Sequence, residues 1–412
     1  MLKIWLGIDL WKRVLGALIV GIIAGFVLGD GAESIRWIGD LFIRAIRMLI
    51  VPLIFFSLVS GIAALGDLKK LGNVGGKALL LFLFTALTSI TLGLTLGTIF
   101  QPGAGLDVSL VAGADVVRPP ELTWTERLLD MIPENPVMTM AEGQILPLIV
   151  FAVLFGISLL MAGEEAKPIV KIVDAGAAVM QQMTMIVMEL TPFGVFALMA
   201  WVTGTFGFEA LLPLATMVGL NYAGCFIIIL LVYPLILRFI AKLPVVDFYR
   251  GIVDAQAVAF STASSNAALP VTLRCVQRNL GVSRSVSSFV VALGATINMN
   301  GTAMYLGLVA LFGAQLYGIE LTMTSYLLIA VTATLGSVGA AGIPGSGLIM
   351  MGLVLSAIGV PLETIAFVAG INHIMDMMRT MTNVTGDATV AVAVGRMAGE
   401  IDVEEYESDD DI

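Results

Sequence analysis

Five residues near the end of the chain have side chains that together can bind a charged ligand. Asp376, Arg379, Thr380, Asn383 and Asp387 are spaced so that, at about 100° per residue, they fall within roughly 100° on one face of a helix. Asp376 can hold an ammonium group and Arg379 a carboxylate through two hydrogen bonds, while the amide and hydroxyl take further oxygens. The stripe therefore predicts an acidic amino acid as the ligand.

The element that must position this stripe is a membrane helix. Of the 412 residues, 58% are apolar and 13% charged, and the mean hydropathy is +0.99. A soluble domain carries far more polar surface. We predict an all-α polytopic membrane protein, and we interpret the first apolar run as a transmembrane helix rather than a cleaved signal peptide. Apolar runs near or above bilayer-spanning length recur at 14–28, 48–65, 78–100, 145–161 and 211–240.

Charged residues in such a helix need partners. Each one costs about 2.5–3.5 kcal/mol near the bilayer centre, even on the most lenient insertion scale. An ion pair between Asp376 and Arg379 that simply locks helices together is the alternative explanation. It does not account for Thr380, Asn383 and Asp387 on the same face. We therefore expect this face to meet ligand, ions or water.

Two polar stretches of small residues precede apolar helices in the last third of the chain. Residues 260–270 (FSTASSNAALP) precede an apolar helix from about 286 to 311 that is interrupted at 298–302 (NMNGT). Residues 336–347 (GSVGAAGIPGSG) precede a second helix from about 362 to 394. Irregular polar backbone is tolerated at membrane depth only inside protein or beside water. We expect two helical hairpins that enter from opposite sides and meet at their tips, as in transporters with repeated broken helices.

The distribution of basic residues predicts the orientation, since they concentrate in cytoplasmic loops. Both termini are then cytoplasmic, and the acidic, proline-rich residues 101–142 are external. Eight acids and no base in 399–412 leave only −2 of the net charge of −10 for the rest of the chain, and we expect this acidic tail to be disordered. The basic residues that set the orientation are Lys3, Lys12, Arg13, Lys69, Lys70, Lys77, Arg238, Lys242, Arg250, Arg274, Arg278 and Arg284.

The motifs together resemble the dicarboxylate/amino acid:cation symporter family, which contains the glutamate and aspartate transporters. The resemblance rests on 376–387 (DMMRTMTNVTGD), 298–302, the serine-rich first hairpin and 342–347 (GIPGSG), and it extends to 48–61 (MLIVPLIFFSLVSG) and 143–147 (GQILP). It implies the glutamate-transporter fold: eight transmembrane helices and two re-entrant hairpins with inverted repeats, in a homotrimer that works as an elevator. It also implies uptake of L-aspartate or L-glutamate by symport with Na⁺ or H⁺ across a bacterial or archaeal cytoplasmic (inner) membrane. No enzymatic activity, further cofactor or nucleic-acid partner is expected.

The resemblance divides the chain into a scaffold and a transport domain. The scaffold comprises 1–76, with the first two helices, and 101–205, with the external loop and the fourth and fifth helices. The transport domain comprises 77–100, with the third helix, and 206–398, with the sixth helix, both hairpins and the last two helices. Residues 399–412 are the acidic tail.

Matched by position, the implied substrate contacts come from both hairpins and the last two helices. They are Arg379, Thr302 and Gly347 for the side-chain carboxylate, Asp376, Thr380 and the Ile343 backbone for the amino group, and Ser265 and Asn383, with Ser264 beside them, for the α-carboxylate.

Cation ligands carry over in the same way. One implied sodium site has Asp387, Asn383, Asn298 and the Gly294 carbonyl; a second, which forms when the second hairpin closes, has Thr296 and the carbonyls of Ser337, Val338 and Ala340. A third would use Thr85, Asn298 and residue 300, where the family usually has aspartate and this chain has Asn300. Because a carboxylate best offsets the desolvation of a cation, we predict fewer coupled sodium ions, or protons instead. The alternative is that Asn300 still ligates through its carbonyl oxygen.

Other functions fit the stripe less well. Asp376 and Asp387 would lie about 16 Å apart along one helix, too far to share a proton as in an aspartyl protease. No ring-forming filter motif suggests a channel. A C4-dicarboxylate carrier would not need Asp376, and a neutral amino acid carrier would not need Arg379.

Overall fold

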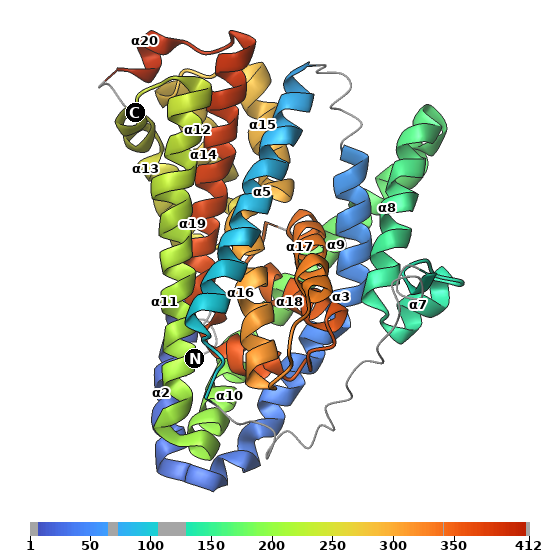
Figure 1. Cartoon of the computed structure of the whole chain (residues 1–412), viewed down its shortest axis with the longest axis vertical. Coiled ribbons are helices and arrows are strands. Elements are labelled where there is room, and N and C mark those ends of the chain that lie inside the picture. Colours follow the sequence, from blue (N-terminus) through green and yellow to red (C-terminus); the bar gives the residue numbers. More distant parts are fainter. Residues whose placement is uncertain (1–6, 65–72, 106–128, 341, 409–412) are drawn as a thin grey trace.

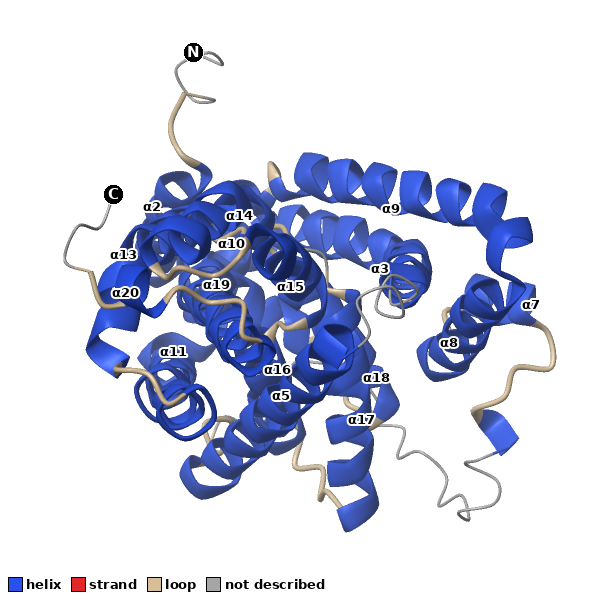
Figure 2. Cartoon of the chain, turned by 90° about the horizontal axis from the view of Figure 1, so that it is seen from above, coloured by secondary structure: helices blue, strands red, loops and turns tan. Residues whose placement is uncertain are grey.

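The computed structural model describes residues 7–64, 73–105, 129–340 and 342–408, and they are predominantly helical (Figures 1 and 2). In these ranges the only strand pairing is an isolated bridge between Val282 and Ile401. The prediction of an all-helical chain with several apolar helices is therefore confirmed. Lys3, Lys69, Lys70 and 106–128 of the expected external loop lie outside the described residues. The described segments long and apolar enough to cross a membrane are Leu10–Ala63, Val74–Phe100, Ile145–Met188, Thr191–Glu209, Leu211–Ala241 and Arg284–Leu316.

A first group of helices packs around α3. In this group α2 and α10 contact each other closely, and α3 contacts α8, α9 and α10. A 3-10 segment, Gly29–Ile35, joins α2 to α3. The helices of this first group are α2 (Leu10–Leu28), α3 (Arg36–Ala64), α7 (Pro136–Glu142), α8 (Ile145–Ala162), α9 (Lys167–Met188) and α10 (Thr191–Phe206).

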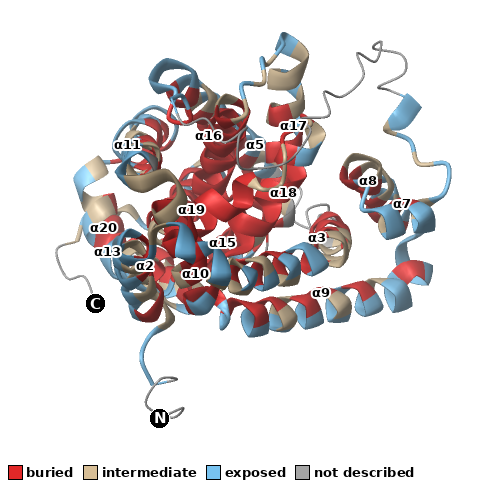
Figure 3. Cartoon of the chain, turned by 90° about the horizontal axis from the view of Figure 1, so that it is seen from below, coloured by how far each residue is buried: buried red, intermediate tan, exposed pale blue. Residues whose placement is uncertain are grey.

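A second group packs around the 35-residue helix α19. Figure 3 shows that α16, α18 and α19 form the most buried part of the molecule. After α11 the chain continues through two π-helical turns, Ile228–Val232 and Leu237–Ala241, on either side of α12 (Tyr233–Ile236). The other helices of this second group are α5 (Asn73–Phe100), α11 (Leu211–Ile227), α13 (Val245–Thr262), α14 (Ser265–Arg274), α15 (Arg284–Ile297), α16 (Asn300–Leu316), α17 (Met323–Gly339), α18 (Ser346–Ala357) and α19 (Thr364–Ala398).

Both polar stretches form tight helical hairpins, and their tips touch. α13 turns into α14 at Ala263, which has a left-handed φ of 49°, and α18 begins after Gly345 at φ 81°. The Ser264 hydroxyl and the Asn266 N–H both donate to the Gly342 carbonyl, at 2.8 and 2.9 Å. The meeting of the tips that the sequence predicted is therefore present.

The predicted interruption near residue 300 is also present, because α15 ends at Ile297 and α16 begins at Asn300. The intervening Asn298 and Met299 have non-helical backbone angles. A backbone of this kind needs polar partners inside the protein. Asn298 is fully buried, and its side chain contacts two other helices, as described below.

The prediction of a disordered acidic tail is wrong for Gly399–Ser408. This segment contains the short helix α20 (Val403–Tyr406), capped by the Asp402 side chain. Tyr406 is buried and donates to the Pro244 carbonyl at 2.8 Å, and the Asp402 N–H donates to the Gly281 carbonyl at 2.8 Å. The acids dominate the composition, but the tyrosine between them anchors the segment to the protein.

Small residues allow α2 and α10 to approach closely. A Cβ atom at Gly21 would lie 2.6 Å from the Phe196 carbonyl oxygen. A Cβ at Gly25 would collide with the Thr203 hydroxyl and lie 2.5 Å from the Ala200 carbonyl oxygen. Such small residues four apart are typical of helix pairs in membranes.

We expect Gly25→Ala to destabilise the protein by about 1–3 kcal/mol, because the added methyl group forces the two backbones apart. Gly16→Ala on the same helix is the matched control, since nothing lies within 4 Å of its Cβ position. Thermal unfolding of the detergent-solubilised variants measures the difference. Equal melting temperatures for both variants would contradict this account of the α2–α10 contact.

Candidate functional site

The stripe predicted from the spacing lies on α19 and faces the interior of the second group. All five side chains are buried, and Arg379 is completely inaccessible to solvent. Since α5, α11, α13, α15 and α16 all pack against α19, the stripe meets protein rather than the outer surface. The polar face therefore belongs to an internal site.

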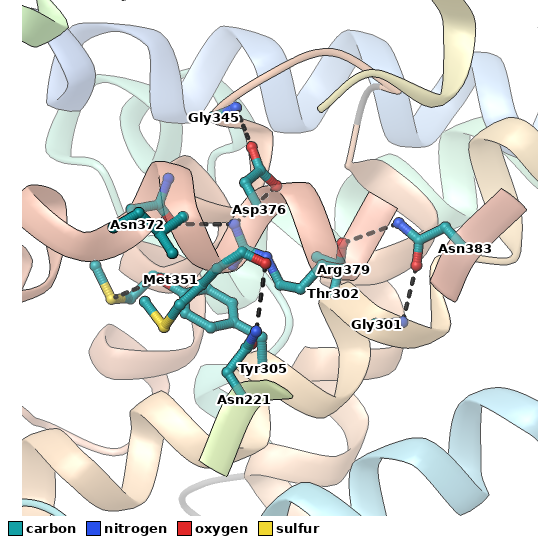
Figure 4. A network of polar contacts seen from close by, with 12 residues as sticks. Asn221, Gly301, Thr302, Tyr305, Gly345, Met351, Asn372, Asp376, Arg379 and Asn383 are labelled. Carbon is teal, nitrogen blue, oxygen red and sulfur yellow. Dashed lines mark hydrogen bonds and ion pairs between the residues drawn. The ribbon is translucent and has the colours of Figure 1, made fainter. Parts of the chain in front are cut away.

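Arg379 is held by three groups (Figure 4). Its Nη2 donates to Asp376 Oδ1 at 2.8 Å and to Asn372 Oδ1 at 3.0 Å. Its Cζ lies 3.8 Å from the centre of the Tyr305 ring, close enough for a strong cation–π contact in a dry environment. The side chain is thus fixed in one orientation.

The same guanidinium keeps two nitrogens without partners. Nε and Nη1 of Arg379 are buried and have no hydrogen-bond acceptor among the described residues. Leaving a buried donor unpaired costs about 1–3 kcal/mol, and more when the group is charged. A Cβ at Gly347 would lie 3.0 Å from Nη1, so glycine there leaves the guanidinium uncovered. This edge of Arg379 is suited to a carboxylate.

Asp376 connects α19 to the second hairpin. Its Oδ2 accepts from the Gly345 N–H at 2.7 Å, while its Oδ1 accepts from Arg379. The turn before α18 is therefore tied to the charged pair. A ligand ammonium group that binds Asp376 would compete with this backbone contact.

Asn383 and Thr302 meet one turn further along α19. The Asn383 Oδ1 accepts from the Gly301 N–H at 2.8 Å, and its Nδ2 donates to the Thr302 hydroxyl at 3.4 Å. A Cβ at Gly301 would lie 2.5 Å from the Arg379 carbonyl oxygen, so only glycine allows the start of α16 to lie this close to α19. The structure thus brings Thr302, Arg379 and Asn383 together.

A second polar cluster lies around Asp387. Asn298 Nδ2 donates to Asp387 Oδ1 at 3.0 Å, and Thr85 donates to Asn298 Oδ1 at 3.1 Å. A Cβ at Gly294 would collide with the Asp387 carboxylate. The break between α15 and α16 therefore meets α5 and α19 at one carboxylate. Asp387, Asn298 and Gly294 of the first predicted cation site lie together here, beside Thr85 of the third. Asn383, the remaining member of the first site, bonds to Gly301 instead.

Asn300 bonds to Tyr233 rather than to this cluster. Its Nδ2 donates to the Tyr233 hydroxyl at 3.0 Å, and that hydroxyl donates to the Thr382 carbonyl at 2.9 Å. Its Oδ1 is buried and has no donor among the described residues. Thr85 and Asn298 of the predicted third cation site are in contact, whereas Asn300 contacts Tyr233.

The second predicted cation site is not assembled by hydrogen bonds between its members. The Thr296 hydroxyl donates to the Leu293 carbonyl at 3.0 Å, and Ser337 donates to the Thr334 carbonyl at 2.8 Å. α15 does pack against α17, and a Cβ at Gly342 would lie 3.0 Å from the Ala295 carbonyl oxygen. Of the remaining predicted residues, Val338 is half-buried. The others are buried: Ser264, Ser265, Ala340, Ile343 and Thr380.

Sequence reasoning did not identify Tyr305, Tyr233 or Gly345. Tyr305 lies three residues after Thr302 on the same helix, a spacing that places both on one face. Tyr233 lies in an apolar run and gives no such signal. No cluster of three or more His, Cys, Asp or Glu side chains suited to a metal occurs in the part of the chain that the structure describes.

Comparison with known proteins identifies the family. A model of the sodium:dicarboxylate symporter family matches residues 10–397. The proton/glutamate-aspartate symporter of Escherichia coli (strain K12) is 35% identical over 408 residues, 95% of this chain and 93% of the relative. The proton/sodium-glutamate symport protein of Geobacillus stearothermophilus is 34% identical over 407 residues, 96% of this chain and 95% of the relative. The C4-dicarboxylate transport protein of Bordetella avium (strain 197N) is 35% identical over 401 residues, 95% of this chain and 89% of the relative. These matches confirm the family predicted from the motifs: the chain belongs to the sodium:dicarboxylate symporter family.

Proposed function

We propose that this protein takes up an acidic amino acid, L-aspartate or L-glutamate, by symport with a cation. The observation that carries the proposal is the buried Arg379, held by Asp376, Asn372 and Tyr305 with two nitrogens unpaired. In a site of low dielectric constant such a guanidinium binds a carboxylate strongly. Relatives named proton/glutamate-aspartate symporter and proton/sodium-glutamate symport protein support it.

Asp376 favours an amino acid over a C4-dicarboxylate, which is the substrate class in the name of the Bordetella avium relative. A dicarboxylate has no cationic group, and a buried carboxylate next to its binding site would repel it. An amino acid offers an ammonium group that can replace the Gly345 N–H on Asp376. Asp376 and Arg379 then each face a substrate group of opposite charge.

We propose Na⁺ as the coupling ion at Asp387, with H⁺ as the alternative. Asp387, Asn298, Thr85 and the nearby backbone supply the oxygen ligands that a hard cation prefers. Thr296 and the carbonyls of Ser337, Val338 and Ala340 would form a second sodium site when the second hairpin closes. Asn300, which supplies an amide where the family usually has a carboxylate, would reduce the number of coupled ions.

We further propose that the first helix group, 1–76 with 101–205, is a fixed scaffold in a homotrimer and that the second, 77–100 with 206–398, moves. The two hairpins would be re-entrant within a bacterial or archaeal cytoplasmic membrane, with both termini inside. The grouping of helix contacts supports this division, because α11, α13, α15 and α16 each contact α19 more extensively than any helix of the first group does. The second hairpin also contacts α3 of the first group.

The relative position of α2 and α19 supports an elevator motion. A cavity of about 180 Å³ is lined by Trp11, Val14, Leu15 and Leu18 of α2 and by Gly370, His373, Ile374 and Met377 of α19. The first turn of α2 is therefore level with the end of the stripe that carries Asp376 and Arg379. From Met377, α19 continues for roughly 30 Å to Ala398, toward α20 (Figure 1). With the amino terminus inside, Asp376 and Arg379 lie near the cytoplasmic end of α2.

Substituting the charged pair tests the substrate. Arg379→Ala should abolish uptake of labelled aspartate into proteoliposomes, and Asp376→Asn should lower it at least tenfold, about 1.4 kcal/mol, because the ammonium loses its partner. Asp254→Asn, in an exposed ion pair with Arg274, is the control and should transport normally. Two results together would identify a dicarboxylate carrier instead. The native protein would take up succinate saturably but no aspartate, and Asp376→Asn would leave the succinate uptake intact.

Imposing sodium and proton gradients separately tests the coupling ion. We expect aspartate uptake to follow the sodium gradient, and Asp387→Asn to raise the sodium concentration for half-maximal uptake roughly tenfold or more, because the buried carboxylate no longer offsets the cation's desolvation. Uptake driven by the proton gradient alone would exclude Asp387 and Thr296 as sodium-coupling residues.

A cross-link between the two helix groups tests the motion. Arg47 of α3 and Glu363 at the start of α19 form an ion pair of 3.1 Å, and both are partly exposed. Linking Arg47→Cys to Glu363→Cys with a bismaleimide should reduce uptake to background, since the cross-link prevents the second helix group from moving relative to the first. Linking Glu33→Cys to Arg36→Cys, a pair within the first group, should not. Normal uptake by the first cross-linked variant would refute the elevator.

A further inference from the structure

A second charged pocket lies between the two helix groups, at the end of the molecule opposite α20. Its volume is about 200 Å³. One wall comes from α3 and α10 of the first group, and the other from the end of α16 and the start of α19. It shares no residue with the stripe. The lining residues that carry the argument are Arg36, Arg44, Arg47, Trp201, Phe206 and Phe367.

Three arginines and one aspartate, Asp40, lie on the side of α3 that lines this pocket; together with Glu363 they leave an excess of one positive charge. At about 100° per residue Arg36, Arg44 and Arg47 fall within roughly 80° on the helix. Arg36 pairs with Glu33 at 3.3 Å and with Asp40 at 3.8 Å, and Arg47 pairs with Glu363 at 3.1 Å. Arg44 forms no ion pair with a described residue. Its guanidinium is therefore available to an anion.

The wall facing Arg44 is aromatic. The ring centroids of Trp201, Phe206 and Phe367 lie 5.7–5.9 Å from one another, and the Arg36 Cζ lies 4.2 Å from the Trp201 ring centre. Trp201 is only 5% exposed, and its Nε1 has no acceptor among the described residues. A buried indole N–H normally finds a partner. The pocket thus combines a cation, an unpaired donor and a flat apolar surface.

We propose that this pocket binds a small organic anion, a carboxylate attached to an apolar body. The carboxylate pairs with Arg44 and accepts from Trp201, while the apolar part packs on Phe206 and Phe367. The ligand enters from the medium on this side, which is external in the orientation proposed above.

The effect on transport rests on the proposed elevator. Because the two walls belong to different helix groups, an occupied pocket stabilises the present arrangement. The anion therefore lowers the maximal rate of aspartate uptake without competing for the substrate site.

The probe is benzoate, added to the purified full-length protein. We expect a saturable rise in melting temperature that is absent with benzyl alcohol, a neutral analogue. Arg44→Gln should abolish the rise, and Trp201→Phe, which keeps the aromatic packing, should weaken apparent affinity several-fold. Arg238→Gln, at an exposed arginine on the π-helical turn Leu237–Ala241, is the control and should behave as the native protein.

Three outcomes would overturn the proposal. One is a benzoate shift that persists in Arg44→Gln. Another is a benzoate-induced rise in melting temperature that disappears with saturating aspartate or in Arg379→Ala but persists in Arg44→Gln. This result would place benzoate in the transport site. The third is loss of the shift in phosphatidylglycerol vesicles but not in phosphatidylcholine vesicles, which would make a lipid headgroup the occupant.

Uptake measurements separate this proposal from the transport function. Arg44→Gln should take up aspartate normally and lose inhibition by benzoate, whereas the native protein should show a reduced maximal rate at unchanged half-saturation. Failure of aspartate uptake in every variant would refute the proposed function and leave the thermal-shift test of the pocket valid. Benzoate binding without inhibition would refute the link between the pocket and the motion.

Discussion

The ion pair between Asp376 and Arg379 constrains the surrounding structure because both charges are buried. Arg379 is fully inaccessible, so every neighbour must either offset its charge or leave room for a ligand that does. Asp376 and Asn372 serve the first purpose on the same helix, and Tyr305 contributes its ring from α16. The Gly345 N–H then links the pair to the second hairpin. One buried charge thus determines how three elements meet.

Glycines make this convergence possible. Cβ atoms at Gly301, Gly294 and Gly386 would each collide with α19 or with a group bonded to it. The break between α15 and α16 can approach α19 closely only because these positions lack side chains. Close approach brings backbone N–H groups and carbonyls within reach of the stripe, where an amide such as Asn383 can bond to them. Packing of small residues, typical of membrane helices, here also builds the polar site.

The proposed substrate and cation groups share one rigid support. Arg379 and Asp387 lie two turns apart on α19, and the broken backbone around Asn298 lies beside both. A change at Arg379 can therefore shift the position of α15 and α16 relative to Asp387, and a change at Asp387 can shift it relative to Arg379. The hairpin tips, joined through Ser264 and Gly342, close the same region. This contiguity gives a physical basis for coupling between ion and substrate.

The sequence alone determined the stripe, because helical spacing places Asp376, Arg379 and Asp387 on one face whatever the partners are. It also determined the break at Asn298 and both hairpins, since polar and small residues at membrane depth have few other uses. Only the tertiary structure decided which faces meet: Tyr305 on Arg379, Tyr233 on Asn300, Tyr406 on Pro244 and Arg36 on Trp201. Periodicity describes the faces of one helix, whereas these contacts join residues that are mostly far apart in the chain. Their pairing depends on how whole helices pack.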